Sequence, residues 1–90
     1  MKIVYVVITT ERWNDEDIDH IEVFEDFNRA KIYFENEIKL LSSPNKLISK
    51  LNEMGCDYMI NYNRNKCTFS VYEKTGKYNA YIYINENVLK

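Results

Sequence analysis

Apolar and polar side chains alternate most regularly in the last third of the chain. The apolar positions recur at every second residue over residues 58–62, 67–71 and 80–84, and short polar segments separate the three runs. A period of two is typical of strands that bury one face and expose the other. The pattern therefore predicts a three-stranded antiparallel meander at the C-terminal end, with its apolar side chains on a single face.

The predicted register places Tyr62 opposite Cys67 in the first hairpin of this meander. In the second hairpin, a two-residue loop at residues 75–76 places Val71 opposite Ala80. The other face then carries mainly tyrosine and small polar side chains: Met59, Asn61, Thr68, Ser70, Tyr72, Asn79, Tyr81 and Tyr83. We expect this second face to be open to solvent, because the helices must cover the apolar one.

The N-terminal part of the chain predicts two further strands. Residues 3–9 are apolar and rich in β-branched side chains, which indicates a central strand. Residues 10–19 are polar and acidic and are interpreted as a loop. Residues 18–24 resume a strand, and antiparallel pairing with the first strand is the simplest arrangement.

Apolar residues spaced by three and four predict two helices in the middle of the chain. The longer stripe consists of Phe27, Ala30, Phe34, Ile38 and Leu41. Asp26 is the expected N-cap of this helix. Ser43 as cap and Pro44 at the first helical position open a second helix, and Gly55 ends it. The expected fold is α+β in the order ββααβββ, an antiparallel sheet with two helices packed on one face.

Length and composition indicate one soluble domain spanning residues 1–90. A domain of this size has little interior to spare for a deep catalytic pocket. The chain has no apolar run of the length that a membrane span requires, so we expect no membrane contact. Two cysteines, Cys56 and Cys67, are expected to stay reduced, as is usual in the cytoplasm.

The residues that catalysis or cofactor binding usually needs are missing from the sequence. His20 is the only histidine, and the two cysteines do not complete a metal-binding spacing with it. No glycine-rich phosphate loop or nucleophile motif occurs. We therefore expect neither enzyme activity nor a cofactor, and His20 is interpreted as a strand residue at the edge of the sheet.

Charge is distributed unevenly along the chain. Residues 1–26 hold eight acidic and two basic side chains, whereas residues 27–90 hold six acidic and ten basic ones. The acidic segment is either a solvated loop or a patch that docks on a basic protein surface. The candidate contact residues of such a patch are Trp13, Asp15, Glu16, Asp17 and Asp19. Carboxylates cannot contact phosphates directly, so this patch would not bind nucleic acid.

The predicted polar face carries the second group of candidate binding residues: Tyr72, Tyr81 and Tyr83. These tyrosines either pack against one another across strands or form a contact surface for another protein. A third interpretation is base stacking with single-stranded nucleic acid, assisted by basic residues of the neighbouring turns. The basic-glycine-aromatic motif of RNA-binding sheets is missing, which disfavours this third interpretation.

Three segments resemble the start of small uncharacterised proteins of phages and prophages. They are Lys2-Ile3-Val4-Tyr5-Val6-Val7, Val23-Phe24-x-Asp26 and Ala30-x-x-Tyr33-Phe34. The resemblance covers roughly the first forty residues and lies in structural positions, so it carries over no functional residue. Small acidic phage proteins of this size include inhibitors of bacterial defence systems, among them anti-CRISPR proteins. The resemblance therefore implies an inhibitor acting in the cytoplasm of a bacterial host.

These observations predict a non-catalytic module that binds a host protein, such as a nucleic-acid-binding defence effector. One alternative is a small domain that binds single-stranded nucleic acid. Another is an antitoxin or immunity-type protein, which would use the same kind of contact surface. Homodimer formation is a further alternative, because either edge strand could pair with a copy of itself.

Overall fold

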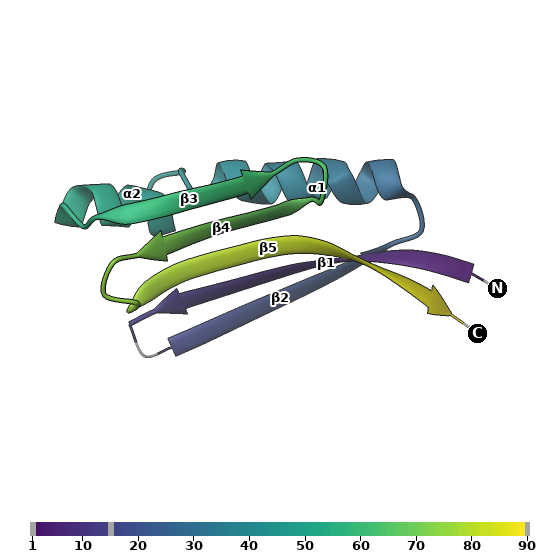
Figure 1. Cartoon of the computed structure of the whole chain (residues 1–90), viewed down its shortest axis with the longest axis horizontal. Coiled ribbons are helices and arrows are strands. Elements are labelled where there is room, and N and C mark those ends of the chain that lie inside the picture. The colour runs from purple at the N-terminus through teal and green to yellow at the C-terminus, as the bar shows by residue number, and fades with distance from the viewer. Residues whose placement is uncertain (1, 15, 90) are drawn as a thin grey trace.

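The computed structural model describes residues 2–14 and 16–89, which form one antiparallel sheet and helices on one side of it (Figure 1). The elements are β1 (Lys2–Trp13), β2 (Glu16–Phe24), α1 (Phe27–Leu40), α2 (Leu47–Met54), β3 (Tyr58–Asn63), β4 (Thr68–Glu73) and β5 (Tyr78–Leu89). The strands lie in the order β2-β1-β5-β4-β3. This arrangement confirms the predicted α+β fold with the order ββααβββ.

The core lies between the helices and the sheet. Phe34 of α1 and Leu51 of α2 are almost completely buried there. Val7, Val71 and Ile82 meet them from β1, β4 and β5. Burial of such side chains contributes about 1.5–3 kcal/mol each, so these few residues hold the two layers together.

The first two strands form a longer hairpin than the sequence predicts. The expected loop at residues 10–19 is wrong, because β1 continues to Trp13 and β2 begins at Glu16. The pairing is regular from Tyr5 opposite Phe24 to Trp13 opposite Glu16. Polar residues dominate the far end of this hairpin because β2 is an edge strand that exposes much of both its faces. Asp15, one of the predicted contact residues, lies outside the described residues.

The meander is present, but its first hairpin pairs two residues away from the predicted register. Tyr62 lies opposite Phe69 rather than Cys67. The centre of the turn lies one residue further along the chain than predicted. The Asn63 carboxamide oxygen fixes this turn by accepting a 3.0 Å hydrogen bond from the Lys66 backbone N–H. Cys67 then takes a left-handed conformation with φ of 52° and precedes the strand. A shift of two residues keeps every side chain on its predicted face.

The second hairpin has the predicted register, with Val71 opposite Ala80. Its turn is closed by the Gly76 N–H, which donates to the Glu73 carbonyl oxygen at 2.9 Å. The Glu73 carboxylate accepts hydrogen bonds from both the backbone N–H and the hydroxyl group of Thr75. These bonds hold the pKa of Glu73 below its ordinary value of 4.5.

A pH-dependent contribution to stability follows from this turn. Because its pKa is lowered by folding, ionised Glu73 stabilises the fold above pH 4.5, and the contribution is lost as the pH falls through the lowered pKa. We expect Glu73→Gln to lower the urea midpoint of unfolding at neutral pH. As the pH falls, the midpoint of the variant should decrease less than that of the wild type. Urea unfolding followed by circular dichroism over a pH series measures both effects. Glu16→Gln, at an exposed site, is the control, and an equal change in both variants would contradict the role of Glu73.

The two helices begin in different ways. The Asp26 carboxylate accepts a 2.9 Å hydrogen bond from the Asn28 backbone N–H, which confirms it as the N-cap of α1. The predicted start of the second helix at Ser43 and Pro44 is wrong, because α2 begins only at Leu47. Residues 42–46 instead form turns, in which the Lys46 N–H donates to the Ser43 carbonyl oxygen. Gly55 ends α2 in the predicted left-handed conformation.

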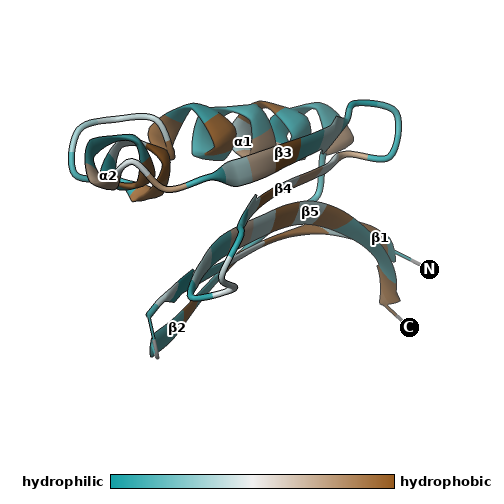
Figure 2. Cartoon of the chain, turned by 60° about the vertical axis from the view of Figure 1, so that its left-hand side comes forward, coloured by the Kyte–Doolittle hydropathy of each residue, from teal (hydrophilic) through white to brown (hydrophobic). Residues whose placement is uncertain are grey.

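The sheet bends along its two longest strands. Both ends of β1 and β5 curve away from the helices, so the side of the sheet without helices is concave along these strands (Figures 1 and 2). This side is called the outer face below. None of the helices in the described part of the chain has the length and apolar character that crossing a lipid bilayer requires.

Candidate functional site

The outer face carries a set of apolar and aromatic side chains that no helix covers. The strand register assigns them to this face because cross-strand partners share a side of the sheet. Members from β1 and β2 are Val6, Ile8, Ile21 and Val23. Val4 shares this side of β1 but is buried. Members from β3, β4 and β5 are Met59, Tyr72, Tyr81, Tyr83 and Leu89. Together they extend over every strand of the described sheet.

Several of these side chains are strongly exposed. The exposed fractions are 67% for Met59, 61% for Tyr72 and 45% for Tyr81. On the opposite edge of the sheet, Ile21 and Val23 are 59% and 58% exposed. Isolated exposed apolar residues are normal on a protein surface, whereas a group that shares one continuous face indicates an interaction site.

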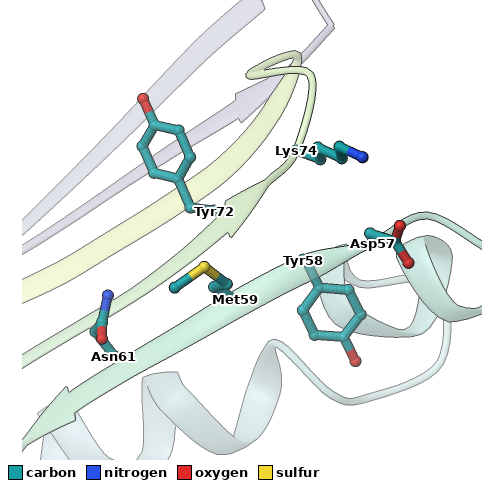
Figure 3. Close-up of a pocket in the computed structure, with 6 residues that line it drawn as sticks. All are labelled: Asp57, Tyr58, Met59, Asn61, Tyr72 and Lys74. Atoms are coloured by element: carbon teal, nitrogen blue, oxygen red, sulfur yellow. The ribbon is translucent and has the colours of Figure 1, made fainter.

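Two grooves lie at the β3–β4 end of the sheet, lined by outer-face residues together with Tyr58, Tyr62 and Phe69 of the helix-facing side. The larger has a volume of about 580 Å³, and Figure 3 shows Tyr72, Met59 and Asn61 standing on the same side of the strands. Asp57 and Lys74 lie at one end of this groove. The second groove, of about 310 Å³, shares Asn61 and continues toward Tyr81. The two grooves therefore form one trough along the edge strand, with mainly apolar walls at its larger end.

The tyrosines predicted as binding residues all lie on this face. Tyr81 and Tyr83 form an edge-to-face pair with ring centroids 5.0 Å apart. Tyr72 stands one strand away, on β4, beside the larger groove (Figure 3). Tyr83 is only partly exposed, while Tyr72 and Tyr81 are open to solvent. The structure thus brings the predicted tyrosines together. Tyr83 packs against Tyr81, and the rings of Tyr72 and Tyr81 remain available for contact.

The predicted acidic patch is divided between the two faces. Asp17 and Asp19 lie on the outer face, opposite Arg12 and Thr10. Trp13 lies on the helix-facing side, where it packs against the core and meets Tyr78 with ring centroids 6.4 Å apart. Glu16, directly opposite Trp13, shares that side. Trp13 therefore shares a side of the sheet with Glu16 but not with Asp17 and Asp19, because strand alternation separates them.

Arg12 binds Asp17 with two hydrogen bonds, at 2.8 and 3.3 Å. The hydrogen bond from Arg12 lowers the pKa of the Asp17 carboxyl group. This pair neutralises part of the acidic end of the hairpin. Among the described strand residues, the outer face then holds two acidic side chains, Asp17 and Asp19, and two basic ones, Lys2 and Arg12.

A second cluster of titratable groups lies on the helix-facing side. Burial raises the pKa of Glu11 on β1, and nearby Lys46 opposes the shift. Burial and a hydrogen bond to Glu37 raise the pKa of Tyr33 on α1. His20, as expected, lies on an edge strand. None of these groups lines either groove, so they take no part in the candidate site.

Sequence reasoning missed three of the most exposed apolar residues of this face as contact candidates. The alternation places Met59 on the correct face but does not mark it as a contact residue beside the tyrosines. Ile21 and Val23 were assigned simply to a strand, and their alternation with His20 and Glu22 was the available signal for a second face. The long pairing of β2 with β1 is what places them beside Ile8 and Val6.

Within residues 2–14 and 16–89, no three histidine, cysteine, aspartate or glutamate side chains gather closely enough to hold a metal ion. Cys56 and Cys67 are both free thiols. Comparison with protein-family models, curated proteins and solved structures found no match to this chain.

Proposed function

We propose that this chain is a non-catalytic module that binds another protein through the outer face of its sheet. The observation that carries the proposal is the gathering of exposed apolar and tyrosine side chains on that one uncovered face. Exposing this much apolar surface to water is costly unless a partner covers it. Tyrosine and methionine are also side chains that protein interfaces favour.

The charge of the outer face supports a protein partner rather than nucleic acid. Binding to a phosphate backbone requires several basic side chains along the bound strand. Arg12 is engaged with Asp17, and the described residues around Tyr81 on neighbouring strands are Thr10 and Ser70. A neutral surface of this kind suits a protein whose contact region is apolar at its centre and polar at its rim.

The class of partner is taken from the resemblance of the N-terminal segments to small phage proteins. On that basis, the proposed partner is a protein of a bacterial defence system, and the chain acts as its inhibitor. The two grooves near Tyr72 would receive protruding side chains of this partner. Asp17 and Asp19 would contact basic residues at the rim of the interface.

Affinity capture from bacterial lysate, read by mass spectrometry, tests the proposal with matched variants. Tyr81→Glu places a charge in the middle of the outer face. Ile32→Glu makes the same change in charge at a site on α1 that is 60% exposed. We expect at least one protein to be captured by the wild type and by Ile32→Glu but lost with Tyr81→Glu.

Two outcomes would contradict the proposal. One is capture of the same proteins by all three forms, which would leave the outer face without a role. The other is binding of single-stranded DNA or RNA in low salt that weakens steeply as salt rises, measured by mobility shift. That result would favour the nucleic-acid alternative.

A further inference from the structure

The two edge strands of the described sheet differ in how they are protected. An edge strand presents unpaired backbone N–H and C=O groups, and natural proteins usually guard it with charged residues or proline. β2 carries four acidic side chains: Glu16, Asp17, Asp19 and Glu22. β3 has neither a charge nor a proline over Tyr58–Asn63. Another strand can therefore pair with β3 more readily than with β2.

Every second residue of β3 directs its backbone groups to the open edge. Opposite residues of an antiparallel pair alternate between hydrogen-bonded and non-hydrogen-bonded positions. The Lys74 N–H donates to the carbonyl oxygen of Asp57, the residue opposite it, at 2.9 Å, which marks this pair as a hydrogen-bonded one. The alternation then leaves the N–H and C=O groups of Tyr58, Ile60 and Tyr62 facing away from β4. These groups can bond to an added strand.

Apolar side chains on both sides of β3 are exposed. Ile60 and Tyr62, on the helix-facing side, are 48% and 40% exposed, and Met59, on the outer face, is 67% exposed. The residues of an added strand would lie about 5 Å away and would shield these side chains from water. Their burial would favour the addition of the strand.

A groove lies on each side of this edge. On the outer face, Met59 and Tyr72 line the larger part of the trough (Figure 3). On the helix-facing side, a groove of about 270 Å³ is lined by Ile38 of α1 and Tyr62 of β3. Successive side chains of an added strand point to opposite sides of the sheet. They would therefore enter the two grooves alternately, which is how strand addition selects a sequence.

The groove on the helix-facing side is more basic than acidic. Its charged residues are Lys39, Arg64 and Glu35. The Arg64 guanidinium group lies over the Tyr62 ring, 5.5 Å from the ring centroid. A carboxylate that enters this groove can accept charge-assisted hydrogen bonds from Arg64. The acidic β2 edge would repel the same carboxylate, so the charges direct an acidic segment to β3.

We propose that the partner contributes an extended segment that adds to β3 as a further, antiparallel strand. An acidic residue of the segment lies opposite Tyr62, and apolar residues lie opposite Ile60 and Met59. The antiparallel direction follows the rest of the described sheet, in which every strand pair is antiparallel. This inference rests on the proposed function, because it names the part of the partner that the trough receives.

Selection of random linear octapeptides, displayed on yeast, against the immobilised full-length chain tests the chemistry of the segment. We expect enriched peptides to carry an acidic residue, any residue and then two apolar residues, in this order along the chain. The reverse order would overturn the antiparallel direction. Absence of enrichment, or enrichment of peptides without this pattern, would overturn the proposal.

A proline variant tests the backbone pairing, with a synthetic enriched peptide as the probe. Ile60→Pro removes an N–H that faces the open edge and leaves the bonds between β3 and β4 in place. Ile60→Thr is the matched control, because it shortens the side chain and keeps the N–H. In fluorescence polarisation, the proline variant should bind the peptide at least about tenfold more weakly, and the threonine variant within about threefold of the wild type. Equal weakening in the two variants would contradict the added strand.

A change in the peptide alone guards against misfolding of the proline variant. Methylation of the peptide nitrogen opposite Ile60 removes the same kind of hydrogen bond without altering the chain. Binding to the wild type should weaken by about tenfold. Unchanged binding of the methylated peptide would overturn the proposal.

A charge exchange tests the contact with Arg64. Arg64→Glu should weaken binding of the peptide by at least about fivefold, and a peptide with lysine in place of its acidic residue should regain most of the loss. Arg29→Glu, at an exposed site near the start of α1, is the control and should bind as the wild type does. Equal weakening by Arg64→Glu and Arg29→Glu would overturn the predicted position of the acidic residue.

Capture from bacterial lysate separates this proposal from the proposed function. A protein that is lost with Tyr81→Glu but retained with Ile60→Pro would overturn the added strand and leave the outer face as the binding site. Peptide binding that Ile60→Pro abolishes, in a chain whose capture is unchanged by Tyr81→Glu, would support the added strand and contradict the role of the outer face. Self-association of the chain alone that Ile60→Pro abolishes, measured by sedimentation velocity, would assign the edge to a second copy and overturn the proposal.

Discussion

Replacing Phe34 with alanine is expected to lower the free energy of unfolding by about 3–5 kcal/mol. Only 1% of this side chain is exposed. It joins α1 to the apolar side of the sheet, and its ring meets that of Tyr62 on β3 at a centroid distance of 6.2 Å. Removing the ring deletes buried apolar surface and leaves a cavity that the surrounding strands can fill only in part.

Urea unfolding of the variant and the wild type measures this loss. Ile32→Ala on the same helix is the control, because Ile32 is 60% exposed and its replacement should change stability by no more than about 0.5 kcal/mol. Similar losses in the two variants would mean that α1 does not pack on the sheet through Phe34. The difference between them therefore tests the layered arrangement directly.

Phe34 also shows why much of the fold could be predicted from the sequence. The apolar stripe of α1 that contains Phe34 can pack against only one surface, the apolar side of the strands with alternating residues. Periods of two and of three to four are set by backbone geometry, and burial of one face makes each period visible in the side chains. The faces of β3, β4 and β5 were therefore predicted correctly even where the pairing was not.

The exact pairing of β3 with β4 depends on local turn chemistry that alternation does not encode. Shifting Tyr62 from Cys67 to Phe69 leaves both residues on the same face, so the apolar pattern suits either register. The side chain of Asn63 and the left-handed conformation of Cys67 decide between them. A cysteine is a rare choice for that conformation, and the sequence alone gives no reason to expect it.

The β1–β2 hairpin was predicted as a loop for a different reason. Residues 10–19 are polar on both faces at most positions, because β2 is an edge strand and the helix-facing side of β1 carries Glu11 beside Trp13. With polar residues on both faces, no apolar period of two appears. The same interpretation grouped Trp13 with Asp17 and Asp19, because faces cannot be assigned within a segment that is taken to be irregular. In the structure, Trp13 packs instead against the core.

Replacing both Tyr72 and Tyr81 with alanine is expected to weaken binding to the captured partner by about 30- to 1,000-fold. This range corresponds to a loss of about 2–4 kcal/mol, which is typical when aromatic residues at the centre of an interface are removed. Both rings are exposed in the free chain, and neither belongs to the buried core. Their removal should therefore cost affinity while leaving the fold intact.

Isothermal titration calorimetry with the purified partner measures the two dissociation constants. Ile32→Ala combined with Leu40→Ala removes a comparable exposed apolar surface from α1 and is the matched control. That control should bind within about threefold of the wild type, because a rim or non-contact residue contributes little. If the tyrosine variant bound as tightly as this control, the partner would contact some other surface. The rings of Tyr72 and Tyr81 would then be exposed without taking part in recognition.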